Sequence, residues 1–565
     1  MKIKRGIGLG EFQSSHDIQE YLKCHPVTAR ILWNRQFKKQ EDLTIFLNPQ
    51  LNELPNPFCI LDLEKSAQRV MQAIQNQESI AVYGDYDVDG TCGMSLLTCF
   101  FKEIGVEVLT YQPDRFKEGY GVHPETVGKL ISNGARCIIT VDCGITAIEA
   151  AKVAKSQNVD LIIIDHHKFA QETPEAFAII NPHHPQDTSG LKNLCGTGLA
   201  FFFVMGLRSL LRENNYFKNI PEPNLLRYLD LVAVATVADM VDIRGVNRIL
   251  LSYGLKVLSQ NPRIGLKAIL KAANILQPTT YHCGFTIGPR LNAAGRVLNA
   301  KAAFNLLISQ NEEEAVELAK QLEEINTERR KLQDEVVQEA LLQAQEQMIQ
   351  TLQPNALVLF NSNWHEGVLG IVASRIVEEF KRPTFVLSKT ESGILKGSVR
   401  SLPKIDILAA ISHPRVASFL KNFGGHAHAG GVSLEPENLE GFIQAINKQL
   451  ALTTSTDQYV KKITCDTEVQ AHELNGVLVE ELERLAPFGQ GFPEPILKLV
   501  DAHCTKITTL KEKHLKMKLN DGLEAIWFNA KKTPDEVSST TTFLVKPEWN
   551  EWQGRKRLQL RVVHY

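Results

Sequence analysis

The segment at residues 81–93 reads AVYGDYDVDGTCG, and its aspartates Asp85, Asp87 and Asp89 occupy alternate positions. Carboxylates this close together repel one another unless a cation lies between them. The letters D-x-D-x-D-G match the start of an EF-hand calcium loop, but the twelfth position is Leu96 instead of a bidentate Glu. The preceding SIAVYG is also typical of a strand. A calcium loop is therefore disfavoured, and a polar turn with three chance aspartates remains the alternative to a catalytic metal site.

Two further strand-like segments end in the same kinds of side chain. TVDCG brings Asp142 to the end of one strand, and LIIIDHH brings Asp165, His166 and His167 to the end of another. In a parallel sheet these carboxyl ends lie along one edge, where ligands bind. Asp239, in ATVADMVDI, is a further candidate on a segment with helical character. A lone histidine is more often structural, but three such strand ends together favour a metal site.

The ligand types narrow the choice of metal. Several carboxylate oxygens with one or two imidazoles suit Mn²⁺ or Mg²⁺ better than a closed structural zinc site, although a catalytic zinc remains open. The candidates suffice for two ions about 3.5–4 Å apart, the arrangement that clamps a phosphoryl group and activates water. The sequence therefore predicts two divalent ions and phosphoryl chemistry.

The elements around these residues alternate between strand and helix. Strands are expected at 79–84, 106–113, 137–144 and 161–167, with helices at 91–105 and 145–157. Strands bounded by helices in this way indicate βαβ units, and continuous Ile/Val runs are typical of strands buried on both faces. We therefore predict an α/β fold with a parallel sheet.

The chain has 565 residues, too many for one hydrophobic core, so several domains are expected. Residues 311–352 contain neither Pro nor Gly and predict a long, charged, exposed connector helix. A second α/β unit follows it, and short β segments with turn residues from about 463 predict a small barrel. The predicted divisions are listed in chain order: a helical lead-in at 1–75, an α/β domain with a helical extension at 76–310, the connector at 311–352, the second α/β unit at 353–455 and the small barrel at 460–565. The family resemblance described below implies that the second of these is catalytic, the fourth substrate-binding and the last nucleic-acid-binding.

The composition is that of an ordinary globular protein, with 44% hydrophobic and 22% charged residues and a formal net charge of −2. The longest apolar run, GLAFFFVMGL, is too short for a membrane span, and the N-terminus has no apolar core of a secretory signal. Ten cysteines without a C-x-x-C pair predict reduced thiols and a cytoplasmic location. Residues 498–565 carry 13 Lys and Arg against 8 Asp and Glu. That balance fits a nucleic-acid-binding face and a solvated lysine-rich surface equally well.

Taken in order, GDYDVDGTCG, TVDCGIT, IDHH and ATVADMVDI resemble the four motifs of the DHH phosphoesterase superfamily. Within it the chain resembles the RecJ family of single-strand-specific 5′→3′ exonucleases, through PDRFKEGYG, FTIGPRLNAAGR, GSVRS, GGHAHAGG and PFGQGFPEP. The resemblance runs from about residue 60 to the C-terminus. One departure is Phe492, where the family pattern has Asn. The resemblance implies a parallel-sheet DHH domain joined by a long helix to a smaller α/β DHHA1 domain, with a C-terminal OB-like β-barrel.

The resemblance also implies roles for the candidate residues. Asp85, Asp87 and Asp142 would hold one ion, and Asp89, Asp142, His166 and Asp239 the other, with Asp142 bridging. His167 would face the scissile phosphate as a proton donor or charge stabiliser, and Asp165 would orient an imidazole. Superfamily members elsewhere use a His slightly upstream of Asp85, where this chain has Tyr83, a poor ligand.

Binding residues follow from the same resemblance. Arg115, Ser398 and Arg400 would form the pocket for the terminal 5′-phosphate, and Tyr120 would stack on or wall off the strand end. Arg290, Asn292 and Arg296, in a Gly/Ala-rich turn, would contact backbone phosphates, with a helix cap as the alternative for Asn292.

GGHAHAGG would supply an anion nest with His426, or simply a tight turn. Four aromatic residues near the C-terminus could stack on bases or lie in the core, and we favour the core for Phe528. The set is Trp527, Phe528, Trp549 and Trp552. Implied partners are single-stranded DNA, a single-strand-binding protein and a RecQ-type helicase.

The expected activity is two-metal hydrolysis of phosphodiester bonds in single-stranded DNA during repair and recombination. Two other functions compete with it. One is an oligoribonucleotide or cyclic-dinucleotide phosphodiesterase, or a pyrophosphatase, of the same superfamily, but such enzymes are shorter and lack the barrel. The other is a non-catalytic DNA-binding scaffold, which predicts lost ligands, whereas every expected carboxylate and both histidines are present.

Overall fold

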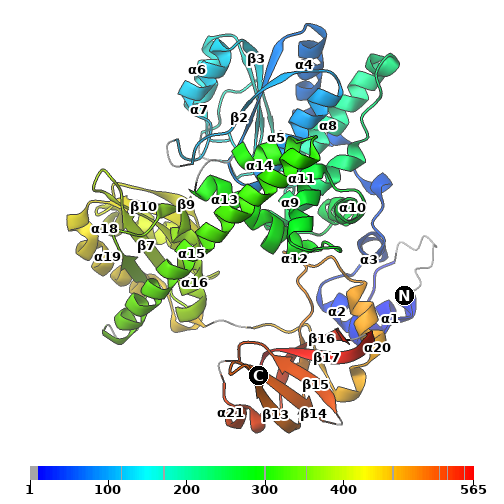
Figure 1. The fold of residues 1–565 in the computed structure, drawn as a ribbon, viewed down its shortest axis with the longest axis vertical. Helices are drawn as coiled ribbons and strands as arrows, with labels where there is room; N and C mark the ends of the chain where they lie inside the picture. Colours follow the sequence, from blue (N-terminus) through cyan, green and yellow to red (C-terminus); the bar gives the residue numbers. More distant parts are fainter. Residues whose placement is uncertain are drawn as a thin grey trace. The chain divides into compact units, whose positions relative to one another are not determined.

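The computed structural model describes residues 10–115, 118–169, 172–297, 301–350, 353–460, 463–520, 522–530, 532–552 and 554–565. The chain forms two compact units (Figure 1). The first comprises Met1–Gly288, Phe304–Val316 and Thr464–Tyr565, and the second Pro289–Ala303 and Glu317–Ile463.

The centre of the first unit is a parallel sheet of the predicted kind. Its strand order is β2-β1-β3-β4-β5, and every neighbouring pair is parallel. The strands are β1 (Ser79–Gly84), β2 (Val108–Tyr111), β3 (Ala135–Val141), β4 (Asp160–Ile164) and β5 (Ala178–Ile180). The order makes β1, β3 and β4 direct neighbours, so the three strands with polar ends lie side by side.

Helices cover both faces of this sheet (Figure 1). Ala81, Ile138 and Ile163 pack toward α6 (Pro124–Ser132) and α7 (Ile148–Ser156). The other face packs against three helices: α4 (Leu63–Gln75), α5 (Val88–Glu103) and α8 (Gly196–Glu213). With both faces buried, the strands are Ile/Val-rich along their whole length. The sequence reading missed α6 and the short strand β5.

Between β5 and residue 312 the chain is mainly helical, as predicted. Besides α8, this stretch includes α9 (Leu229–Ala238), α10 (Val246–Gln260), α11 (Ile264–Ala272) and a π-helical segment at Cys283–Ile287. Near the N-terminus lie α1 (Ser15–Leu22), α2 (Pro26–Asn34) and α3 (Gln40–Leu47).

The C-terminal part of the first unit is a seven-stranded mixed sheet in the order β11-β12-β16-β17-β15-β14-β13. Its strands are β11 (Thr467–Val469), β12 (Leu497–Leu499), β13 (Cys504–Leu510), β14 (His514–Leu519), β15 (Leu523–Trp527), β16 (Phe543–Trp552) and β17 (Arg555–His564). The helix α20 (Gly476–Glu483) lies between β11 and β12 in the chain.

This C-terminal part docks on the N-terminal helices through an aromatic cluster. Phe492, the residue that departs from the family pattern, is fully buried, and its ring centroid lies 4.5 Å from that of Phe46. The guanidinium of Arg35 lies over the same ring. A larger apolar ring is favourable here because the position is a hydrophobic contact between the two parts of the unit.

The second unit is built on the sheet β6-β7-β8-β10-β9. Its strands are β6 (Leu357–Phe360), β7 (Thr384–Lys389), β8 (Leu395–Arg400), β9 (Asn422–His426) and β10 (Ala429–Leu434). One face packs on α16 (Leu369–Phe380), and the other on α17 (Ile407–Ser412), α18 (Pro414–Ala417) and α19 (Leu439–Thr453).

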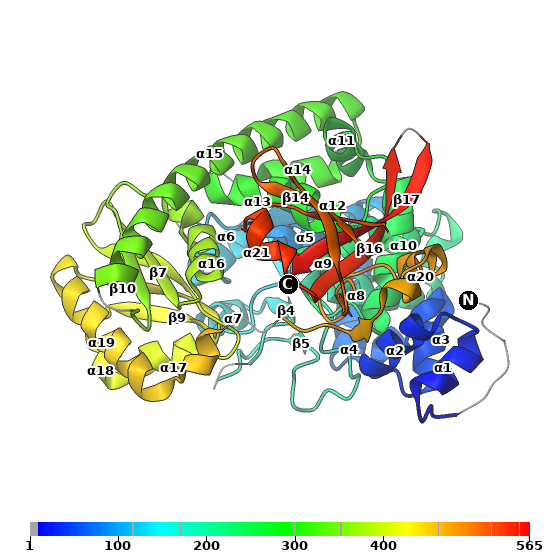
Figure 2. The ribbon, with the colours of Figure 1, turned by 90° about the horizontal axis from the view of Figure 1, so that it is seen from below.

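The connector helix α15 (Glu312–Gln350) runs as one continuous helix (Figure 2). Its length agrees with the prediction, but its full exposure does not. Val336, Val337, Ala340 and Ala344 are buried in a core that includes Trp364. Small apolar residues spaced by three and four form a narrow stripe, and this stripe packs on the second sheet although the helix is highly charged overall.

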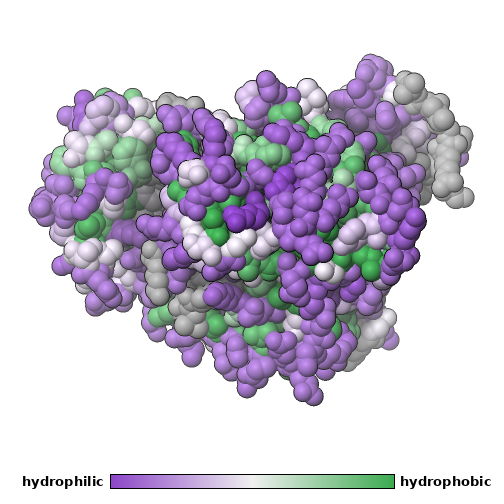
Figure 3. All heavy atoms as spheres, turned by 90° about the horizontal axis from the view of Figure 1, so that it is seen from above, coloured by the Kyte–Doolittle hydropathy of each residue, from purple (hydrophilic) through white to green (hydrophobic). Residues whose placement is uncertain are grey.

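The surface in Figure 3 is dominated by hydrophilic residues, with hydrophobic residues in small patches. Among the described helices, none is both long enough and apolar enough to cross a membrane.

Candidate metal centre and active site

The candidate site lies at the carboxyl edge of the parallel sheet. Asp85 directly follows β1, Asp142 follows β3, and Asp165 to His167 follow β4. The backbone ladder continues into the first two of these residues. The N–H of Asp85 donates to Val141 (3.3 Å), and that of Asp142 donates to Ile164 (2.9 Å). The ladder therefore fixes where these carboxylates leave the sheet.

Asp87 ends the loop after β1 and begins α5. Its Oδ1 accepts the N–H groups of Asp89 (2.9 Å) and Gly90 (3.1 Å), so it caps the helix. A Cβ at Gly90 would lie 2.5–2.7 Å from backbone atoms of Asp85, so only glycine fits. The alternating aspartates thus lie on a tight strand-to-helix turn. This turn directs the side chains of Asp85, Asp87 and Asp89 toward one region.

Two of the candidate ligands stand at left-handed turns. Asp142 has φ +62°, and Met240, directly after Asp239, has φ +58°. Asp239 is the C-cap of α9, whose last residue is Ala238. Left-handed backbone in a non-glycine residue is costly and is concentrated at functional sites, so both turns are consistent with a site that demands a particular carboxylate direction.

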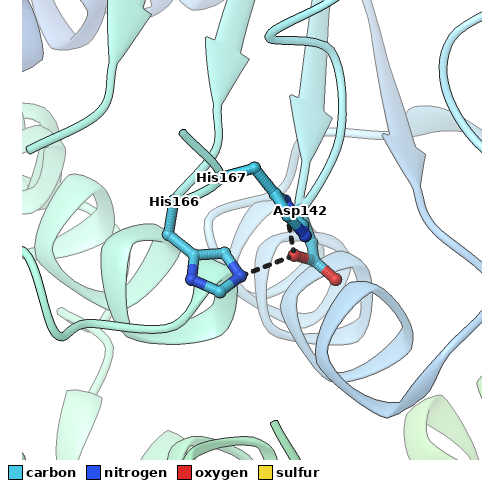
Figure 4. A group of neighbouring side chains, drawn as sticks. All are labelled: Asp142, His166 and His167. Atoms are coloured by element: carbon cyan, nitrogen blue, oxygen red, sulfur yellow. Dashed lines mark ion pairs between the residues drawn. The ribbon is translucent and has the colours of Figure 1, made fainter. Parts of the chain in front are cut away.

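The side chains converge as Figure 4 shows for Asp142, His166 and His167. The Nε2 of His166 lies 3.2 Å from Asp142 Oδ1, 3.5 Å from Asp239 Oδ2 and 3.8 Å from Asp89 Oδ2. Among the residues that the structure describes, three groups have ligand atoms within 4.8 Å of one another: Asp85, Asp87 and Asp142; Asp89, His166 and Asp239; and Asp142, His166 and His167. The first group has the membership that the family pattern implies for one ion. The second contains three of the four residues implied for the other ion, and the fourth, Asp142, has its Oδ1 3.2 Å from His166 Nε2.

Unpartnered buried atoms support the fit of a metal. Asp85 Oδ1, Asp142 Oδ1, His166 Nε2 and Asp239 Oδ2 are buried, and none has a hydrogen-bond partner among the described residues. Buried polar atoms are normally paired, and four unpaired ligand atoms in one place leave their lone pairs available to cations. Carboxylate oxygens with one imidazole match a hard divalent ion such as Mn²⁺ or Mg²⁺.

The electrostatics of the cluster point the same way. Burial and the neighbouring carboxylates Asp89 and Asp87 raise the pKa of Asp142 well above its usual range. Burial, followed by the charge of Asp89, raises the pKa of Asp239 to about 8. Burial lowers the pKa of His166, which favours the neutral, metal-binding imidazole. Divalent cations would remove this repulsion and allow all the carboxylates to ionise.

The N-terminus of α8 holds Asp89. The N–H of Gly196 donates to Asp89 Oδ2 (2.6 Å), and the N–H of Thr197 donates to Oδ1 (2.8 Å). The Thr197 hydroxyl also donates to the Asp89 carbonyl (2.8 Å). The positive end of an 18-residue helix thus fixes the orientation of this carboxylate. Sequence reasoning missed this clamp, although the small residues of CGTG before a long apolar helix were a usable signal.

His167 is connected to Asp165. Its Nδ1 lies 2.8 Å from Asp165 Oδ1, and the fully buried Asp165 also accepts the N–H groups of His167 and Ile145. Burial opposes the charged imidazolium, but the hydrogen bond and charge of Asp165 raise the pKa of His167 to about 9. The pair therefore favours the charged imidazolium, with Nδ1 engaged by Asp165 and Nε2 left for another partner.

Tyr120 lies beside this centre in space, and Arg115 precedes Tyr120 by five residues in the chain. The hydroxyl of Tyr120 is 3.2 Å from His167 Nδ1 and also contacts the Asp142 carbonyl (3.2 Å), while much of its ring is exposed. Arg115 lies over the ring of Tyr86, with 5.2 Å from its Cζ to the ring centroid. Tyr83 is fully buried and donates to Gly121, so it is not a ligand.

In the second unit, Ser398 and Arg400 come together on β8. A Cβ added at Gly370, in the first turn of α16, would lie 3.0 Å from Arg400 Nη2 and 3.4 Å from Ser398 Oγ. The two side chains therefore meet the start of this helix. GGHAHAGG forms the β9–β10 hairpin, with His426 exposed on the edge strand β9.

The residues of FTIGPRLNAAGR lie in helix α13 (Gly288–Val297) and the segment before it, so the predicted Gly/Ala-rich turn is wrong. Small residues permit close helix packing here as readily as a turn. Arg290 is buried and pairs with Glu323 of α15. Asn292 is half-buried within the helix, not at a cap. The side chain of Arg296 lies outside the described residues.

The aromatic residues of the C-terminal part differ in exposure. Phe528 is 50% exposed, so the preference for a core position was wrong. Its ring instead contacts His514. Trp527 and Trp549 are half-buried, and the side chain of Trp552 lies outside the described residues.

Three family models match the chain: the DHH family N-terminal domain at residues 79–236, the DHHA1 domain at 353–452 and the RecJ OB domain at 465–564. The matches agree with the predicted fold class. Each covers one of the three sheets described above.

Curated relatives extend the match over nearly the whole chain. The single-stranded-DNA-specific exonuclease RecJ of Bacillus subtilis is 32% identical, over 96% of this chain and 68% of the relative. The Haemophilus influenzae protein of the same name is also 32% identical, over 95% of this chain and 96% of its own length. The crystal structure of Thermus thermophilus RecJ in complex with Mn²⁺ superposes with a TM-score of 0.83 and 27% identity, over 99% of this chain and 78% of that one. With the ordered motifs and the converging ligand atoms, these similarities show that the chain belongs to the RecJ family of the DHH phosphoesterases.

Proposed function

We propose that the protein is a single-strand-specific 5′→3′ exodeoxyribonuclease that acts in DNA repair and recombination and depends on two Mn²⁺ or Mg²⁺ ions. The observation that carries this proposal is the convergence of four unpartnered, buried ligand atoms at the carboxyl edge of the parallel sheet. Membership of the RecJ family supplies the substrate class, and the polarity comes from the family resemblance. A non-catalytic scaffold has no need to retain this cluster.

Asp85, Asp87 and Asp142 would hold one ion, and Asp89, Asp142, His166 and Asp239 the other. When bound, such a pair activates water and neutralises charge on the phosphate under attack. The residues of the chain prepare for this: Asp87 is fixed as a helix cap, and Asp89 is fixed by two N–H groups of α8. Because hydrogen bonds already hold these two carboxylates, they would lose little conformational freedom when cations bind.

His167 would act on the phosphate itself. Asp165 holds its Nδ1 and stabilises the imidazolium, so a proton is available at Nε2 for the leaving oxygen. The same positive charge would stabilise the extra negative charge of the transition state. Tyr120 would confine the strand end beside His167.

We assign the remaining candidates to phosphate binding. Ser398 and Arg400 would bind the terminal 5′-phosphate, since a guanidinium, a hydroxyl and a helix start together suit a dianion. Arg115 would be a second phosphate contact. The backbone-phosphate assignments are Arg290, Asn292, Arg296 and His426. To bind a phosphate, Arg290 would have to break its ion pair with Glu323 or contact both groups at once.

The proposal extends to partner proteins and to the cellular location. A single-strand-binding protein and a RecQ-type helicase would deliver the single strand, and the protein would work in the cytoplasm. Sequence preference would be weak, because phosphate contacts position a strand without identifying its bases.

The test uses a 5′-phosphorylated single strand labelled at its 3′ end, with Mn²⁺, and the same strand in a blunt duplex. Asp142→Asn removes the shared ligand with little change of shape, and Arg400→Ala tests end recognition. We expect stepwise shortening of the free strand only, no activity for Asp142→Asn, and loss of the preference for 5′-phosphate over 5′-hydroxyl ends for Arg400→Ala. Binding without cleavage by the unchanged protein, with either metal, would refute the exonuclease assignment in favour of a scaffold.

A further inference from the structure

A cavity with a mixed polar and apolar lining lies in the first unit, next to the segment that carries Asp239. Its volume is about 500 Å³, and it lies among α3, the turn at 190–194 and the start of α10. Phe46 and Leu191 form part of its apolar wall. Its polar wall includes Arg244, Asn247 and Arg248 and two carboxylates, Asp42 and Asp242, of which Asp242 is paired with Arg244. None of the metal ligands proposed above lines it.

The N-terminus of α10 opens into this cavity without a cap. The N-cap residue is Gly245, at φ +57°, and no side chain of the described residues bonds to the first turn. Gly245, Val246 and Asn247 all line the cavity. A 15-residue helix therefore presents free N–H groups and the positive end of its dipole to this space.

Asn247 provides a second, independent indication. Its side chain is 2% exposed, and its Nδ2 donates to the carbonyls of Asn193 (2.6 Å) and Asp242 (2.8 Å). These two bonds identify the nitrogen and leave Oδ1 as an acceptor, which has no partner among the described residues. A buried acceptor without a donor is costly, so a donor supplied by a ligand would stabilise this wall.

Arg248 provides the third indication of a ligand site. It is 2% exposed, and its guanidinium donates to the carbonyls of Phe46, Leu485, Ala486 and Pro487. Within the described chain, no carboxylate forms an ion pair with it, whereas Arg244 is paired with Asp242. Its guanidinium also lies over the ring of Phe46, 3.6 Å from Cζ to the ring centroid. A buried cation held by carbonyl dipoles and a ring, without a carboxylate, favours a nearby anion.

We propose that this cavity binds a phosphate-type oxyanion, whether the phosphate of a mononucleotide or that of a nucleic-acid backbone. The anion would accept from the N–H groups of Val246 and Asn247 and lie close to Arg248. A hydroxyl of the phosphate or of its sugar would donate to Asn247 Oδ1. Asp242 and Arg244 follow the proposed metal ligand Asp239 by only three and five residues. A bound anion would therefore also restrict the motion of the turn that carries Asp239.

The test adds a carboxylate to the proposed anion site. Val246 is half-buried at the first position of α10, where Glu is favourable for the helix, and Val246→Gln is the neutral control of the same size. Metal-free protein in EDTA is titrated by calorimetry with inorganic phosphate, with dAMP and with a 12-nucleotide single strand. Thermal unfolding checks that both variants fold like the unchanged chain.

We expect Val246→Glu to lose one phosphate equivalent, or to bind it at least about tenfold more weakly, while Val246→Gln matches the unchanged protein. The same loss for dAMP, but not for the strand, identifies a mononucleotide site, and the reverse identifies a strand contact. Identical isotherms for all three chains would overturn the proposal.

Crystals of the unchanged protein soaked with tungstate, a phosphate analogue, provide a measurement that needs no variant. Anomalous density at the start of α10 is the expected result, and density only elsewhere would count against the site. Because these measurements use no metal and no cleavage, the proposal can fail or stand independently of the exonuclease activity.

Discussion

Gly196→Ala is the sharpest test of how the metal ligands are held. A Cβ at this position would lie 2.8 Å from Asp142 Cβ and 3.1 Å from Asp89 Oδ2. The first distance is shorter than real carbon contacts, so either the start of α8 or the two carboxylates must move. The displacement therefore falls on a ligand of each proposed ion.

The size of the effect follows from two separate terms. Overpacking costs about 1–3 kcal/mol of stability, and Ala gains up to about 1 kcal/mol over Gly within a helix, so the net loss of unfolding free energy is roughly 0–3 kcal/mol. Displacing reacting groups by as little as 1 Å costs on the order of 100-fold in rate. Disturbing the groups that orient ligands weakens metal binding about 10- to 100-fold. Activity should therefore fall much further than stability.

The assay is single-strand hydrolysis over a Mn²⁺ titration, with urea unfolding beside it. Gly198→Ala is the matched control, because its Cβ would approach only flexible atoms of Leu194, at 3.3 Å or more, and Cys195. We expect Gly196→Ala to need more Mn²⁺ and to remain about 100-fold slower at saturation, with Gly198→Ala close to the unchanged protein. Equal activity for the two variants would refute the idea that α8 positions these carboxylates.

Three further results are expected. His167→Gln should lower the cleavage rate about 10²- to 10⁴-fold while leaving Mn²⁺ affinity nearly unchanged, since it removes a proton donor and not a main ligand; a large loss of Mn²⁺ affinity would assign His167 to the metal instead. In EDTA, stability should fall as pH rises from about 5 to 8.5. The raised pKa of Asp239, about 8, means that its contribution is complete below the ordinary carboxyl pKa and is lost as pH rises through the folded value. Urea unfolding at several pH values measures this trend, which Mn²⁺ and Asp239→Asn should both flatten; stability that rises with pH in EDTA would contradict it. Arg248→Met should lower the free energy of unfolding by about 2–4 kcal/mol, because four carbonyls lose their donor, and a loss below about 1 kcal/mol would show that solvent replaces it.

The sequence alone determined the chemistry and most of the sheet. Aspartates at the ends of Ile/Val-rich segments predict a metal site at the carboxyl edge of a parallel sheet, since strand direction and side-chain type are local properties. β1 was placed at its observed bounds, 79–84, because a run of six residues rich in β-branched and aromatic types, ending in glycine and followed by polar residues, is too short for a helix and favours a buried strand. The long α15 was also evident from the absence of Pro and Gly.

Tertiary structure decided what depends on partners distant in the chain. That β1, β3 and β4 are neighbours is a matter of strand order, which periodicity does not encode. Gly196 and Thr197 reach Asp89 across more than a hundred residues, and Arg290 is paired with Glu323 in place of facing solvent. Phe528 is exposed although its type favours burial, because it lies in the turn directly after β15 and not on a strand of the sheet. The local sequence thus identifies the candidate ligands. Long-range packing determines which of them come together and which groups hold them in place.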